Sequence, residues 1–228
     1  MLIAYNRTRL RQVLSYSVRL GANSLRLNAF VKGLGLQFDE GSRLIGVQPT
    51  VLNALRDAAD LALEHGILLQ VVLSTAHFLR FGWGGAAKVV RGSTNQQRVQ
   101  RNQQLFLDPV RFAQVVLVQI AAALGKHPAV VGFLLVNEGY AMVRKEDKPL
   151  SDVTDASLPL QSLQAFINTA ASALKQILPG TLRECKLISK RQTKDPPGST
   201  TLAWLMMTCF EPTSHTSLSH SRPQSPKL

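Results

Sequence analysis

The chain has 228 residues, of which 45% are hydrophobic and 18% are charged, with a formal net charge of +12. This balance excludes a fully disordered chain and fits one sizeable hydrophobic core. Cys185 and Cys209 have no partners at metal-ligand spacing, so we expect neither a metal nor a disulfide framework, and no cofactor. The chain also lacks an apolar run long enough to cross a bilayer, and residues 1–5 do not form a secretory signal, so we expect no membrane partner. The sequence does not indicate the cellular compartment of the protein.

The first 182 residues repeat one pattern, in which an amphipathic helix ends at or near a glycine and a short apolar strand follows. Helix boundaries are marked by prolines in the first turn, as at Pro49 and Pro109, and by closing glycines such as Gly125. Apolar strands that alternate with helices are typical of a parallel sheet covered by helices. The pattern predicts helices at 7–20, 49–65, 109–124 and 160–178, and strands at 24–29, 67–74 and 129–136.

The loops that follow the strands, 30–48, 75–106 and 139–157, are longer than those that follow the helices. This asymmetry is typical of a barrel whose catalytic face carries long loops. A doubly wound sheet would show it too, but neither Gly33-Leu34-Gly35 nor Gly82-Trp83-Gly84-Gly85 continues into a nucleotide-binding motif. We therefore predict an α/β fold, a partial (β/α)8 TIM barrel.

Residues 186–228 differ in character from the rest of the chain. They hold five of the eleven prolines and many serines and threonines, without helical or strand periodicity, and the apolar patch at 202–210 stands alone. A short motif that folds onto a partner is one interpretation of that patch. We instead predict a partial barrel domain at 1–185 and a disordered or out-of-frame tail at 186–228.

The densest basic stretch runs from Arg80 to Arg101 and contains no acidic residue. It could bind a polyanion, but no nucleic-acid motif accompanies it. A solvated loop is the favoured interpretation, and a nucleic-acid partner is not expected.

The most informative segment is Phe133-Leu134-Leu135-Val136-Asn137-Glu138. An apolar strand ends here in an amide and a carboxylate, and in parallel α/β folds the chemistry lies at the carboxyl ends of strands. The position favours a reactive carboxylate at Glu138, while a loop-capping role remains the alternative.

Three segments together resemble glycoside hydrolase family 5 and its wider clan A, nearest to the mannanase-like members (endo-β-1,4-mannosidases). These are Gly21–Phe30, Ala58–Leu69 and Asp108–Glu138, which occur in the family's order. The resemblance implies the N-terminal half of the barrel only, about strands 2–4 with their helices. The family usually has proline after Asn-Glu, whereas Gly139 follows here.

The resemblance implies roles for individual residues. Glu138 matches the general acid/base, Asn137 the amide that holds the sugar 2-hydroxyl, and Arg26 a buried arginine that orients the nucleophile. His77 and Trp83 match substrate contacts more loosely, and an ordinary loop histidine and a packing tryptophan are the alternatives. A retaining glycosidase needs a second carboxylate about 5–5.5 Å from the first. In the family it comes from the seventh strand, and no residue of this chain matches that nucleophile.

The leading hypothesis is a retaining glycoside hydrolase that acts on a β-linked polysaccharide or oligosaccharide such as mannan, inactive as this truncated chain. The second hypothesis is a non-catalytic remnant that binds carbohydrate or protein. The third is a basic, nucleic-acid-binding α/β domain.

Overall fold

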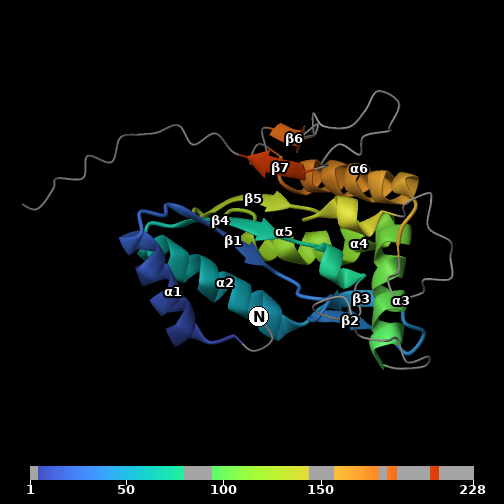
Figure 1. Cartoon of the computed structure of the whole chain (residues 1–228), viewed down its shortest axis with the longest axis horizontal. Coiled ribbons are helices and arrows are strands. Elements are labelled where there is room, and N and C mark those ends of the chain that lie inside the picture. Colours follow the sequence, from blue (N-terminus) through green and yellow to red (C-terminus); the bar gives the residue numbers. More distant parts are fainter. Residues whose placement is uncertain (1–4, 80–93, 144–156, 180–183, 189–205, 211–228) are drawn as a thin grey trace, which may run out of the picture.

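The computed structural model describes residues 5–79, 94–143, 157–179, 184–188 and 206–210 (Figure 1). Its α-helices are α1 (Arg7–Arg19), α2 (Pro49–Glu64), α3 (Thr94–Leu107), α4 (Pro109–Phe112), α5 (Val118–Leu124) and α6 (Leu160–Ile177). Its strands are β1 (Ser24–Asn28), β2 (Leu36–Phe38), β3 (Leu44–Val47), β4 (Leu68–Val72), β5 (Val130–Leu134), β6 (Glu184–Ile188) and β7 (Met206–Phe210). A π-helical segment, η3 (Ala113–Leu117), joins α4 to α5, and two short 3₁₀ helices, η2 (Ala76–Phe78) and η4 (Gly139–Met142), follow β4 and β5.

The central sheet begins with three parallel strands in chain order, β1, β4 and β5. In a doubly wound sheet the strand order would reverse, whereas sequential parallel strands are the arrangement of a (β/α)8 barrel. The predicted strands at 24–29, 67–74 and 129–136 are confirmed. The four predicted helices are confirmed as well, and their predicted first and last residues differ from the observed ones by one residue at most. The helix predicted at 109–124 corresponds to α4, η3 and α5 together.

Helices α2, α5 and α6 pack together with the sheet around one hydrophobic core (Figure 1). On β1 the residues Leu25 and Leu27 pack against this core, whereas Ser24, Arg26 and Asn28 are exposed. Side chains alternate between the faces of a strand, so β1 turns one apolar face to the helices and one polar face away from them. Aromatic rings fill the space beside α6, where Phe166 lies 4.7 Å from Phe106 and 5.0 Å from Phe112 between ring centroids.

Local sequence signals explain the helix ends. The Asn6 side chain accepts a hydrogen bond from the Arg9 backbone N–H, and the Asp108 carboxylate accepts one from Arg111 in the same way. Each caps the first turn of its helix, where backbone N–H groups have no partner inside the helix. After α2 the chain turns at Gly66, whose φ of +65° suits a residue without a β-carbon.

Two segments expected to be loops contain regular structure. Residues 30–48 include the antiparallel hairpin β2–β3, and residues 75–106 include α3. The prediction of a solvated loop is therefore wrong from Thr94 to Arg101, which is helical. Helix α3 docks through buried Val99, Leu105 and Phe106, but its polar composition hides the helical period. The remainder of the basic stretch, 80–93, lies outside the described residues.

The C-terminal hairpin β6–β7 was also not expected. Strand β7 lies in the apolar patch at 202–210 and pairs antiparallel with both β5 and β6. Met206–Phe210 falls in the predicted tail and is a strand in the structure, through its pairing with β5 and β6, while the tail as a whole stays a prediction. Because barrel strands are parallel, this hairpin is not a barrel unit. Residues 189–205 and 211–228 lie outside the described ranges, and the boundary at residue 185 stays a prediction.

Within the described ranges no single helix is long and apolar enough to cross a bilayer. One bent pair, Gln97–Leu107 with Pro109–Leu124, passes that test by length and composition.

Candidate functional site at the carboxyl edge of the parallel sheet

The loops that leave β4 and β5 are joined to each other at the carboxyl edge of the sheet. Thr75 and Asn137 form a parallel bridge, in which the Asn137 N–H donates to the Ser74 carbonyl at 2.8 Å and the Ala76 N–H donates to the Asn137 carbonyl at 3.2 Å. The buried Ser74 hydroxyl donates to the Leu135 carbonyl at 2.5 Å. These bonds fix the backbone from which Glu138 projects, a supporting role for Ser74 and Thr75 that the sequence alone did not indicate.

Glu138 follows the bridge directly and is partly buried. Its backbone has φ 57° and ψ 39°, the left-handed conformation. That conformation costs a residue with a β-carbon about 1–2 kcal/mol, and strained residues of this kind cluster at functional sites. The strain here is held in place by the Thr75–Asn137 bridge on one side and by η4 on the other.

His77 lies on η2, the short helix after β4, and is partly buried. Its backbone N–H donates to the Thr75 hydroxyl at 3.2 Å, and η2 packs against η4. The structure therefore brings His77, Asn137 and Glu138 to the same edge of the sheet, from segments about sixty residues apart in sequence. Their functional roles remain predictions.

Arg26 lies in the middle of β1, where its register partner is Gln70 on β4, and Gln70 in turn pairs with Gly132 on β5. The resemblance implied a buried arginine, but Arg26 is exposed. The physical reason is that this face of β1 is uncovered: Ser24, Arg26 and Asn28 alternate onto the same face, and all three are exposed. No carboxylate of the described residues forms an ion pair with Arg26.

Glu138 is the one carboxylate at this edge among the described residues. The other acidic residues of the described ranges lie on the β2–β3 hairpin, on α2, at the start of α4 and at the start of β6. The described ranges also contain no cluster of three or more His, Cys, Asp or Glu that could hold a metal ion. Trp83 lies outside the described residues. The arrangement can therefore supply one carboxylate for proton transfer, beside an amide and an imidazole.

Comparisons with known proteins were made at the level of sequence and of structure. No protein-family model matches the chain, and no curated protein matches its sequence. Solved structures do match. The β-mannanase from the blue mussel Mytilus edulis is 21% identical, with a TM-score of 0.59 over 77% of this chain and 50% of the mussel chain. The β-1,4-mannanase from the sea hare Aplysia kurodai is 23% identical, with a TM-score of 0.59 over 78% of this chain and 51% of the other.

A more distant match is a GH5_18 structure from Streptomyces cattleya in complex with GlcNAc. It is 18% identical, with a TM-score of 0.53 over 79% of this chain and 39% of that one. The chain thus spans about half the length of the mannanases it matches. These likenesses, the parallel strand order and the flanking helices together establish that the chain has the mannanase-like fold of family 5 glycosidases, as part of a TIM barrel.

Proposed function

We propose that this chain is the acid/base-bearing half of a retaining glycoside hydrolase that acts on β-linked mannan. The observation that carries the proposal is the position of Asn137-Glu138 directly after β5, the third sequential parallel strand of a mannanase-like fold. The substrate, the retaining mechanism and the activity belong to the proposal.

In this mechanism the Glu138 carboxyl protonates the glycosidic oxygen as the bond to the leaving sugar breaks. The resulting carboxylate then removes a proton from the water that releases the bound sugar. Asn137 orients the sugar by hydrogen bonding to a hydroxyl next to the reacting carbon. Its backbone is fixed by the bridge to Thr75, which holds the amide at the edge of the sheet.

The first half of this reaction also needs a nucleophilic carboxylate about 5–5.5 Å from the acid. Among the described residues Glu138 has no such neighbour at the carboxyl edge, and Arg26 has no carboxylate to orient. We therefore propose that the 228-residue chain alone does not turn over substrate. Four further strand–helix units would supply the nucleophile and cover the polar face of β1.

A non-catalytic carbohydrate-binding role is the second candidate. It is favoured by the same single carboxylate, since sugar binding requires hydrogen-bonding groups but no acid/base pair. His77, Asn137 and Glu138 supply such groups at one edge of the sheet.

The test compares the 228-residue chain with a chimera in which the C-terminal half of the Mytilus edulis β-mannanase follows α6. Release of reducing ends from β-mannan is measured for both, and binding of mannohexaose is measured by calorimetry. The proposal predicts no turnover by the short chain and clear turnover by the chimera. Mannohexaose binding without turnover in either protein would favour the non-catalytic role, and turnover by the short chain would contradict the need for a second carboxylate.

A further inference from the structure

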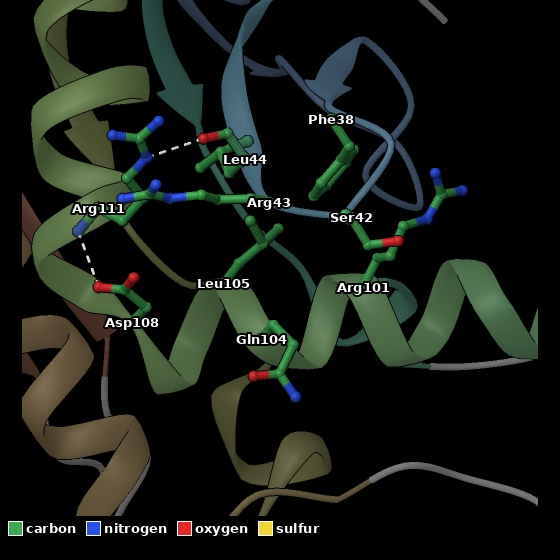
Figure 2. A pocket seen from close by; sticks show the side chains of 10 residues that line it. Phe38, Ser42, Arg43, Leu44, Arg101, Gln104, Leu105, Asp108 and Arg111 are labelled. Carbon is green, nitrogen blue, oxygen red and sulfur yellow. Dashed lines mark hydrogen bonds between the residues drawn. The ribbon is translucent and has the colours of Figure 1, made fainter.

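A pocket of about 340 Å³ lies between the β2–β3 hairpin and α3, and its lining includes none of His77, Asn137 and Glu138. Figure 2 shows its walls: Phe38 and Ser42 come from the hairpin, and Asp108 lies where α3 gives way to α4. Three arginines line it, Arg43, Arg101 and Arg111. These residues come from separate segments, so the pocket is formed by the fold and not by one basic run.

The three arginines keep donor groups available. The Arg111 Nε–H donates a hydrogen bond to the Leu44 carbonyl at 2.8 Å. This bond fixes the side chain and does not use its two terminal nitrogens. The guanidinium of Arg101 lies 5.1 Å from the centre of the Phe38 ring, and its buried Nε has no hydrogen-bond partner among the residues that the structure describes. Arg43 is exposed at the hairpin. Within the described ranges none of the three forms an ion pair.

One carboxylate, Asp108, lines the pocket, so three cations and one anion leave two uncompensated positive charges. Asp108 accepts a hydrogen bond from the Arg111 backbone N–H at 3.0 Å and is thereby directed at the helix end (Figure 2). Asp39 accepts from the Arg43 backbone N–H at 2.7 Å in the same hairpin but does not line the pocket. The side chains that face the pocket therefore favour a negatively charged ligand.

A second hollow adjoins the first and shares Ser42, Arg101 and Gln104 with it. The rest of its lining is Gln97, Gln100 and Gln103. An amide side chain both donates and accepts hydrogen bonds, which is what a ring bearing several hydroxyl groups requires. The arginine pocket thus opens onto a groove suited to a hydroxylated molecule.

We propose that the arginine pocket binds an oxyanion carried by a hydroxylated ring, that is, an acidic sugar with a carboxylate, sulfate or phosphate group. The planar guanidinium of Arg43 or Arg111 matches an oxyanion with two parallel hydrogen bonds. Phe38 supplies an apolar wall and the glutamine groove takes the hydroxyl groups. The site is independent of Glu138 and of the proposed hydrolysis.

The test is calorimetric titration of the full 228-residue chain, at low salt, with glucuronic acid, glucose 6-sulfate and glucose 6-phosphate. Three variants are compared. Arg43→Gln removes an exposed pocket arginine, and we expect affinity to fall about tenfold, the effect of losing one charge-assisted hydrogen bond. Asp108→Asn keeps a helix-capping side chain but removes the pocket carboxylate, and we expect affinity to rise several-fold. Arg56→Gln removes an exposed arginine of α2 outside the pocket, and we expect no change beyond about twofold.

The three acidic sugars distinguish the source of the oxyanion, because the tightest of them identifies the group that the pocket fits. Saturable binding of at least one, weakened by Arg43→Gln and strengthened by Asp108→Asn, supports the site. Absence of saturable binding of all three sugars overturns it, as does equally tight binding of neutral mannotriose. Equal losses of sugar affinity in Arg43→Gln and Arg56→Gln would identify a general positive field and overturn the site. So would tight binding of a single-stranded oligonucleotide that both substitutions weaken equally.

Discussion

At the scale of single residues the distinctive feature is Glu138, an acidic residue in left-handed backbone conformation beside a bridged strand end. Three non-glycine residues in the described ranges have positive φ, namely Lys32, Ser42 and Glu138. Glycine at Glu138 would relieve the steric cost. Backbone strain of this kind clusters at functional sites, which supports the proposed role of Glu138.

This strain makes a prediction about stability. Glu138→Gly should raise the free energy of unfolding by about 0.5–1 kcal/mol, because relief of the left-handed conformation exceeds the added freedom of glycine in the unfolded chain. Glu138→Gln keeps the β-carbon and should leave stability unchanged. Urea denaturation of the two variants measures the difference, with Ser42→Gly, at φ 61°, as a matched control. A Glu138→Gly variant less stable than the Gln variant would show that the side chain itself holds the loop.

At the scale of elements the attachment of α3 links the hairpin region to the candidate site. Asn102 on α3 is 1% exposed, and its amide nitrogen donates to the carbonyls of Lys32 and Phe78 at 2.9 Å each. Lys32 precedes the β2–β3 hairpin and Phe78 ends η2, next to His77. One side chain therefore holds together the loops that follow β1 and β4.

Removing that side chain should loosen α3. Asn102→Ala leaves the buried Phe78 carbonyl without its donor and removes one of the two donors of the Lys32 carbonyl, which also accepts from Arg98, so we expect the free energy of unfolding to fall by about 1–3 kcal/mol. Gln100→Ala, an exposed position on the same helix, should change it by less than about 0.5 kcal/mol. Urea denaturation with unchanged slope gives both values. Equal effects of the two substitutions would mean that Asn102 is not what anchors the helix.

The elements also divide by how far the sequence predicts them. Helices α1, α2 and α6 and strands β1, β4 and β5 follow from local signals, because caps, prolines and apolar runs act within a few residues. The β2–β3 hairpin and α3 could not be predicted from local signals, since a three-residue strand and a glutamine-rich helix carry little periodicity. The pairing of β7 with β5 depends on a contact between residues 134 and 208 that no local pattern encodes.

The candidate site divides in the same way. Asn137-Glu138 was predictable, because a polar pair ending an apolar strand is visible in the sequence alone. The bridge to Thr75, the left-handed backbone and the exposure of Arg26 were not, because each depends on which strands lie side by side. The arginine pocket likewise joins a hairpin to two helices that only the fold brings together.

At the scale of the whole molecule the chain has sequential parallel strands, helices on their apolar side, and a polar face on β1 that no described residue covers. It matches half the length of β-mannanases. The central claim is that the carboxyl edge of this sheet carries the proton donor of a glycosidase, and that the nucleophile comes from a part of the barrel beyond β5.

The leaving-group dependence of turnover tests that claim most directly. The measurement compares the mannanase chimera with its Glu138→Gln variant on β-mannan and on an activated nitrophenyl β-mannoside, at saturating azide. Mannan requires protonation of the leaving oxygen, so we expect turnover to fall by about 10²–10⁴-fold in the variant. A nitrophenolate leaves without a proton and azide needs no general base, so the same variant should lose less than about tenfold on that substrate. Equal losses on both substrates would contradict an acid/base role for Glu138, and no loss on mannan would remove Glu138 from the mechanism.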